Sequence, residues 1–161
     1  MVPGQAQQDT IHWRQDYKLK WDDFQGKPDM NSDNRAITVV DVGYDLSFTK
    51  NKFDVTVSCV FMKKKSWKKE EDSVRLAHEQ GHFDIAEIFA RKLRMAFRSY
   101  VFNSKTISSD FRSIFSKLYA DKEALDSLYD KETDFSRNRS MQLIWNKKIL
   151  TELHKLDPYK E

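Results

Sequence analysis

The chain has 161 residues, of which 39% are hydrophobic and 13% aromatic, and it carries a net charge of +3. This length fits one domain that buries about two-thirds of the surface of its unfolded chain. The small net charge gives no reason to assign a nucleic-acid or membrane-surface partner. No run of about 18 apolar residues occurs, so no membrane span is predicted. The single cysteine, Cys59, excludes an intrachain disulfide.

Residues 1–9 read MVPGQAQQD and are polar, with a proline, a glycine and three glutamines. This composition predicts a disordered N-terminal segment, which leaves one domain over residues 10–161. The small residues of Gly4–Gln7 are typical of a signal-peptidase site, although no apolar segment precedes them. We therefore expect an exported protein, periplasmic or extracellular, from which the signal peptide has been removed.

The N-terminal half has the alternating pattern of an antiparallel sheet. Tyr17–Phe24 predicts a short first strand. Apolar and polar residues then alternate along Val40–Phe48 and along Phe53–Phe61, and Thr49–Lys52 suits the hairpin turn between them. We expect a small twisted sheet with one apolar face.

Lys63–Lys69 reads KKKSWKK and is the densest basic run in the chain. Basic residues around an aromatic side chain can bind nucleic acid. The acidic residues Glu70, Glu71 and Asp72 follow directly, however, and can balance the lysines. We therefore expect a solvated loop and no nucleic-acid partner, and keep polyanion binding as a third hypothesis.

The sequence His78-Glu79-Gln80-Gly81-His82 matches the pattern H-E-x-x-H. On a helix the two histidines stand about 40° apart and one turn from each other, so both can bind one Zn²⁺. Glu79 is rotated by about 100° from His78, which suits a general base rather than a ligand. A bound zinc lowers the pKa of a water ligand to about 7 and so supplies a nucleophile.

The helix that carries this motif is predicted over Glu70–Tyr100. Both histidines share its apolar stripe, and the opposite side carries Arg91, Arg94 and Arg98. Glu87 is not expected to be a ligand, because it projects about 180° from His78, and Asp84, at about 240°, is not expected to support a ligand. Gly81 costs about 1 kcal/mol relative to alanine in an exposed helix, and we expect the close approach of another backbone as its reason.

Two further helices are predicted, one capped by Ser108 or Ser109 and one beginning near Ser136 or Asn138. His154 is expected at the surface of the last helix. Because strands come first and helices follow, the fold class is α+β, with a small antiparallel sheet packed on the long motif helix and on two further helices.

Three motifs in the same order resemble a bacterial family known as domain of unknown function 922. They are WDDFQGKPD at Trp21–Asp29, HEQGHFDIAE at His78–Glu87 and YDKETDFSRN at Tyr129–Asn138. Members of that family are described as predicted secreted zinc-dependent proteases. The resemblance implies a zincin-like fold, zinc as cofactor, a peptide or protein substrate, the two motif histidines as zinc ligands and Glu79 as general base.

A third zinc ligand is the open question of the predicted site. The third motif of the family reads T-x-H, but here Thr133 and Asp134 are followed by Phe135, which cannot bind zinc. The same segment holds three carboxylates, Asp130, Glu132 and Asp134. One of them could complete the ligand set, with Asp134 and Glu132 the better candidates, or all three could be loop or capping residues, and the sequence leaves these two readings open.

The leading hypothesis is an exported zinc metallopeptidase whose substrate pairs as an extended strand with a sheet edge beside the motif helix. Tyr129 is a candidate donor to the developing oxyanion. The alternative is a zincin-like domain whose metal site is degraded by Phe135 and which acts as a binding or regulatory module. No feature of the sequence indicates an oligomeric state.

Overall fold

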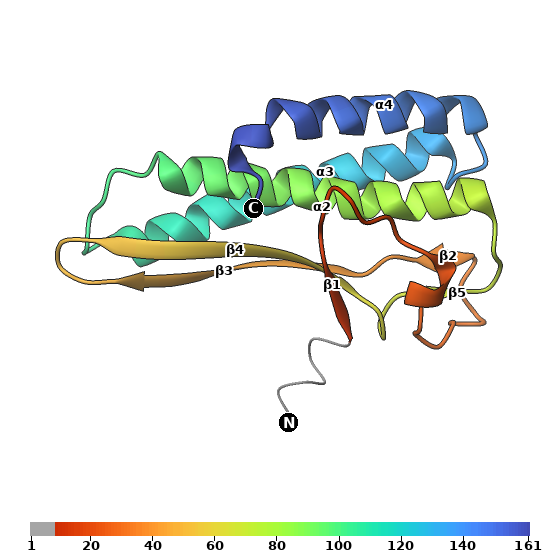
Figure 1. Ribbon diagram of the computed structural model, residues 1–161, viewed down its shortest axis with the longest axis horizontal. Helices are drawn as coiled ribbons and strands as arrows, with labels where there is room; N and C mark the ends of the chain where they lie inside the picture. The colour runs from red at the N-terminus through yellow and green to blue at the C-terminus, as the bar shows by residue number, and fades with distance from the viewer. Residues whose placement is uncertain (1–8) are drawn as a thin grey trace.

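Three long helices lie on one side of a narrow antiparallel sheet in the computed structural model, which describes residues 9–161 (Figure 1). The fold is α+β, as the order of the elements predicted. The N-terminal segment predicted to be disordered lies outside the described residues, apart from Asp9. No helix within residues 9–161 has the length and apolar character needed to span a membrane.

The larger sheet has three strands in the order β1-β4-β3. They are β1 (Thr10–His12), β3 (Val40–Phe48) and β4 (Phe53–Met62), and all pairings are antiparallel. The predicted hairpin is confirmed, since the register pairs Phe48 with Phe53. The inward side chains of β4 are half-buried at Phe53 and Val55 and buried at Val57, Cys59 and Phe61, in line with the alternation.

Two very short strands, β2 (Ala36–Ile37) and β5 (Trp67–Lys68), form a second antiparallel pair. The basic run is therefore partly a strand rather than a free loop. The Lys68 ammonium lies 2.6 Å from Glu71 and donates to the carbonyl of Trp21.

The predicted strand over Tyr17–Phe24 is absent, and the chain instead forms a 3₁₀ helix, η1 (Trp21–Asp23). The Asp23 carboxylate accepts from the Lys20 backbone N–H at 2.8 Å, while the Asp23 N–H donates to the Lys20 carbonyl at 2.9 Å. These local bonds satisfy backbone groups that a strand would have paired with a neighbour. Leu19 is nonetheless buried, so the alternation located a core residue but not its conformation.

The helices are α2 (Ser73–Arg98), α3 (Ile107–Thr133) and α4 (Arg139–Lys155), followed by a 3₁₀ turn, η2 (Asp157–Tyr159). Helix α2 begins three residues later than predicted, because Asp72 is its N-cap and accepts from the Arg75 N–H at 2.9 Å. Asn138 caps α4 in the same way, as predicted.

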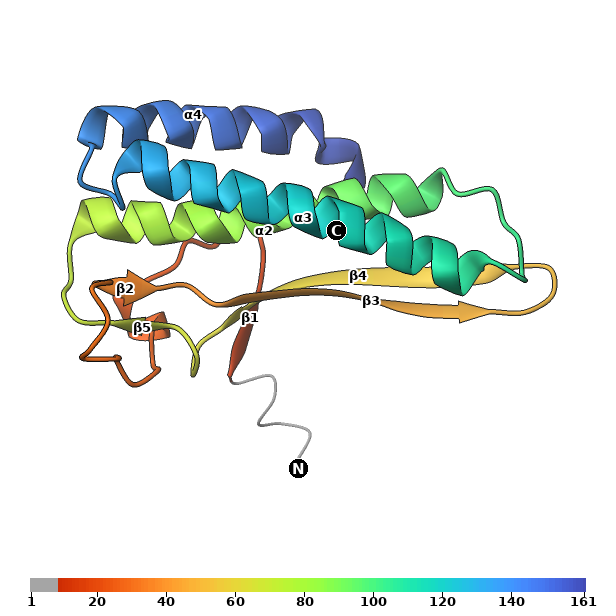
Figure 2. The same cartoon turned by 180° about the vertical axis from the view of Figure 1, so that it is seen from behind.

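Helix α2 is the centre of the molecule. It contacts β3 and β4 on one side and α3 and α4 on the other, and the view from behind shows α3 and α4 along its outer side (Figure 2). Phe97 of α2 stacks on Phe111 of α3, with ring centroids 4.1 Å apart.

Much of the side of α2 that was expected to face solvent is also buried, although Arg98 near its end is exposed. Arg91 and Arg94 are 1% and 8% exposed, and both contact the Glu87 carboxylate, at 2.9 Å and 3.0 Å. The expectation of a single buried stripe was wrong because the C-terminal segment covers this face: Arg91 donates to the Leu153 carbonyl at 2.7 Å. Burial of the charges is tolerated because they are paired and hydrogen-bonded.

Candidate metal centre

The two motif histidines converge on one carboxylate oxygen from α3. The Oδ1 atom of Asp130 lies 3.0 Å from Nε2 of His78 and 2.9 Å from Nε2 of His82, and the two nitrogens are 3.3 Å apart. Ligands held tetrahedrally at about 2.0–2.1 Å from a zinc ion are roughly 3.3 Å from one another. His78, His82 and Asp130 are thus spaced as a group that could hold a metal ion.

The outer nitrogens of both imidazoles are held by side chains from other helices. Nδ1 of His78 lies 3.0 Å from Oε1 of Gln142, and Nδ1 of His82 lies 2.9 Å from Oδ1 of Asp126. Gln142 is oriented by its own amide, which donates to Asn146 at 2.8 Å. Since both partners are acceptors, both Nδ1 atoms carry the proton, and both Nε2 lone pairs face Asp130.

Three acceptor atoms that face one another require a cation between them, either a proton or a metal ion. Burial would lower the pKa of His82, but its hydrogen bonds to Asp126 and Asp130 outweigh burial and raise that pKa to about 10. Burial would raise the pKa of Asp130, but its hydrogen bonds to both histidines hold it well below the usual range. A metal ion that binds here has to displace the proton, so binding weakens at low pH.

The centre is covered on one side and open on the other. The side chain of His78 is 4% exposed, that of His82 17% and that of Asp130 30%. A catalytic metal site keeps a position for water or substrate, whereas a structural site is closed by protein ligands. Asp130 is the most exposed of the three side chains, so solvent reaches the group from its side.

Asp126 links His82 to a lysine on the same helix, since its Oδ2 lies 2.8 Å from Nζ of Lys122. We expect Asp126→Ala to weaken zinc binding by about 10- to 100-fold without abolishing it, because His82 keeps its ligand atom but loses the group that orients it. Competition titration against a chromophoric chelator measures the change. Asp121→Ala, an exposed aspartate on the same helix, is the matched control. Equal affinities for Asp126→Ala and wild type would contradict the orienting role.

Tyr129 packs against His78 and orients it. Its ring stacks on His78 at 4.5 Å, and its hydroxyl donates to the His78 carbonyl at 3.0 Å and accepts from the Gln142 amide at 2.6 Å. The side chain is fully buried, and burial raises its pKa well above the usual range. The sequence had suggested that Tyr129 donates to an oxyanion. Its hydroxyl instead donates its hydrogen bond to the backbone carbonyl of His78, so Tyr129 holds His78 in place.

Gly81 is explained by the same tyrosine. A Cβ atom at position 81 would overlap the hydroxyl oxygen of Tyr129. The sequence predicted the close approach of a backbone, but the neighbour is a side chain.

Gly81→Ala should therefore destabilise the protein by about 1–3 kcal/mol, since overpacking outweighs the gain of about 1 kcal/mol in helix propensity. Thermal unfolding measures the change. Gly43→Ala is the matched control, because nothing lies within 4 Å of a Cβ built there. A Gly81→Ala protein as stable as the control variant would show that Tyr129 can move aside without cost.

Glu79 is buried and points to the junction between β2 and β3. The hydroxyl of Thr38 donates to Oε2 of Glu79 at 2.6 Å. Thr38 was not identified from the sequence, because it lies 41 positions before Glu79 in a segment without a motif.

The two carboxylates favoured as third ligand lie elsewhere. Asp134 follows the end of α3 and forms an exposed ion pair with Arg137 at 2.8 Å. Glu132 accepts from the indole N–H of Trp145 at 2.7 Å. The structure brings Asp130 to the histidines instead.

Phe135 does not lie in the ligand position that the resemblance assigned to it. Its side chain is 52% exposed and lies against Arg137, with the guanidinium carbon 6.0 Å from the ring centroid. It belongs to a turn of three consecutive non-glycine residues with positive φ, at positions 134, 135 and 136.

Comparison with known proteins gives one family. A search of curated proteins and a search of solved structures each gave no match. The family model described as "Bacterial protein of unknown function (DUF922)" matches residues 2–137, a span that contains both histidines and Asp130. Because this match covers most of the 161 residues, the chain belongs to the DUF922 family.

Proposed function

We propose that this protein is a zinc-dependent metallopeptidase in which His78, His82 and Asp130 hold the metal ion. The observation that carries the proposal is the convergence of two Nε2 atoms and one carboxylate oxygen within 3.3 Å of one another. Acceptors from α4 and α3 hold both Nδ1 atoms, an arrangement that is usual for imidazoles that bind a metal through Nε2.

Zinc is favoured over other ions by the ligand set and the motif. Two imidazoles and one carboxylate, with room for a further ligand, are the set found in catalytic zinc sites. The same set also binds non-haem iron(II), but H-E-x-x-H on a helix is typical of zinc peptidases. The bound metal is therefore one of the quantities to be measured.

The remaining chemistry falls to residues of the chain. When bound, zinc supplies Lewis-acid chemistry, which polarises a carbonyl group and acidifies water. Glu79, directly after His78 on α2, takes the proton from the attacking water and returns it to the leaving amine. The Thr38 hydroxyl occupies Oε2 of Glu79 and fixes the carboxylate, so Oε1 is the atom assigned to proton transfer.

A peptide substrate is supported by the position of β3. This strand pairs with β4 on one side, and within the described residues no strand pairs with its other side. It begins at Val40, two residues after Thr38, so its unpaired edge starts beside the group that holds Glu79. An extended peptide could add to this edge through backbone hydrogen bonds.

The alternative is a binding or regulatory module without catalysis. It was based on Phe135 as a lost ligand, and that basis is weaker if Asp130 completes the group, as its spacing from the two histidines allows. Export to the periplasm or the exterior belongs to the proposal as well, and rests on the composition of residues 1–9 and on the family resemblance.

The direct test is hydrolysis of an unfolded protein such as casein by protein purified without chelator or metal-binding tag. We expect about one zinc per chain, because the structure holds one group of converging ligands within its described residues, and cleavage that a chelator abolishes and added zinc restores. Full zinc occupancy without cleavage would favour the regulatory module. Absence of bound metal would overturn both readings of the site.

A further inference from the structure

A cavity of about 730 Å³ lies on the side of α2 away from the metal centre. It is lined by His12 of β1 and residues 13–16 after it, by Cys59 of β4, by Glu87 and Arg94 of α2, and by residues 160–161. Glu87 projects from α2 about 180° from His78, so the two sites are on opposite faces of one helix. The volume is in the range of small-molecule sites, about 300–1,000 Å³.

Arg94 is the buried cation of this cavity, with a side chain that is 9% exposed. A guanidinium has five N–H donors. The acceptors around it are Oε1 of Glu87 at 3.0 Å, the Tyr159 carbonyl at 3.2 Å and the Val57 carbonyl at 3.1 Å. The Nε–H is buried and has no partner within the described residues. Donors therefore outnumber acceptors, which is costly in a buried group.

A further acceptor near Arg94, the Glu161 carboxylate, is too distant to satisfy its remaining donors. Oε1 of Glu161 lies 3.9 Å from Nη2 of Arg94, which is too long for a hydrogen bond. Lys160 lines the same cavity, and its ammonium has no ionic partner among residues 9–161. The single negative charge of Glu87 does not balance the positive charges of Arg94 and Lys160, because Glu87 also pairs with Arg91.

We propose that this cavity binds a small molecule through a carboxylate group, which Arg94 and Lys160 contact. The planar fork of an arginine matches a carboxylate, and two of its donors are unmet here. Trp13 supplies an aromatic wall for the rest of the ligand. The proposal does not depend on a metal ion at His78 and His82.

The test uses sodium benzoate as probe and benzamide as its neutral counterpart. In ¹H–¹⁵N spectra of the full chain at constant ionic strength, benzoate should shift the Nε–H signal of Arg94 in a saturable way. Benzamide should bind at least about tenfold more weakly than benzoate, since it lacks the charge that strengthens the hydrogen bonds. Equal shifts with both compounds, or no saturable shift with benzoate or with succinate as a second carboxylate, would overturn the proposal.

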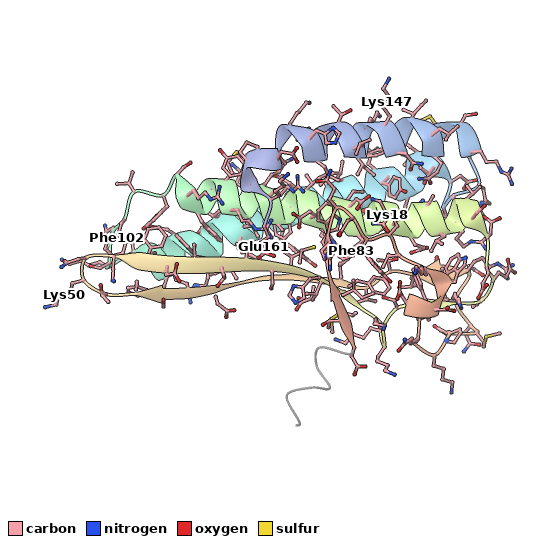
Figure 3. All side chains as sticks on the ribbon, viewed as in Figure 1. Lys18, Lys50, Phe83, Phe102, Lys147 and Glu161 are labelled. Carbon is pink, nitrogen blue, oxygen red and sulfur yellow. The ribbon has the colours of Figure 1, made fainter. Side chains whose placement is uncertain are left out.

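Two variants locate the binding. Because Arg94→Lys has no arginine Nε–H to observe, binding in the variants is followed by the backbone N–H signals of residues 12–16, which line the cavity. Arg94→Lys should abolish the saturable benzoate shift of these signals. Lys160→Gln, at an exposed position that is not expected to affect folding, should weaken benzoate binding several-fold. Lys147→Gln removes the same charge from the outer side of α4, far from Glu161 in Figure 3, and should leave binding unchanged. His82→Ala should also leave it unchanged, so failure of the metal site and failure of this cavity are distinguishable. Equal weakening in Lys147→Gln and Lys160→Gln would indicate a general charge effect and contradict the proposal.

Discussion

Asp130→Ala should lower the affinity of the protein for zinc by about 10²-fold or more. Apparent binding free energies of zinc sites are roughly 10–16 kcal/mol for about four ligands, so one ligand contributes about 3 kcal/mol, or about 10² in affinity. The Nε2 atoms of both histidines also converge on Oδ1 of Asp130, so the substitution removes the third candidate metal ligand of the group.

The measurement is zinc affinity by competition with a chelator, together with metal content after gel filtration. Asp134→Ala and Glu132→Ala are matched controls from the same segment, and both should bind zinc like wild type because their partners are Arg137 and Trp145. If Asp134→Ala or Glu132→Ala lost zinc while Asp130→Ala retained it, the third ligand predicted from the sequence would be right and the geometry of the centre wrong.

The elements with a strong period were predictable, because their burial follows directly from the pattern. Alternation fixed β3 and β4 and even their pairing, since a four-residue turn between Phe48 and Phe53 leaves little freedom in the register. Alternation failed over Tyr17–Phe24, where only a few residues alternate and Asp23 satisfies the backbone locally.

A helical wheel could not predict that Arg91 and Arg94, on the side of α2 opposite the histidines, are buried. A wheel sorts residues by type and therefore places Arg91 and Arg94 in water. In the structure both arginines contact Glu87, and the C-terminal part of the chain covers them: Arg91 contacts Leu153 and Asp157, and Arg94 contacts Tyr159. Such a buried ion network depends on tertiary packing that sequence spacing does not contain.

Asp130 was among the carboxylates considered as a third ligand but was not preferred, because the segment after residue 128 was interpreted as a connection between helices. Helix α3 in fact continues to Thr133. On a continuous helix Asp126, Asp130 and Thr133 share one face at spacings of four and three residues, and Tyr129 lies beside them. That spacing was the available signal: four polar or aromatic side chains on one face suggest a site, whereas Glu132 projects toward Trp145.

Glu79→Gln should reduce hydrolysis by a factor of about 10²–10⁴ while leaving zinc content unchanged, because it removes a positioned base but no ligand. Glutamine has nearly the same shape, and its carbonyl oxygen can still accept from the Thr38 hydroxyl, which holds Oε2 at 2.6 Å in the structure. The fold should therefore be preserved. Thr38→Val should cause a smaller loss, because the carboxylate remains but its orientation is no longer fixed.

The measurement combines turnover of an unfolded protein substrate, metal content and thermal unfolding for the same preparations. Glu70→Gln, an exposed glutamate just before α2, is the control for loss of one negative charge. Undiminished hydrolysis by Glu79→Gln would place the activity at another site or in a contaminant. Asp130→Ala should lose metal and activity together, whereas Glu79→Gln should lose activity alone. In a regulatory module Asp130→Ala would still lose metal, but no variant would lose hydrolysis, because wild type has none. The two variants therefore distinguish a metal ligand from a general base, and the hydrolysis of wild type distinguishes an enzyme from a binding domain.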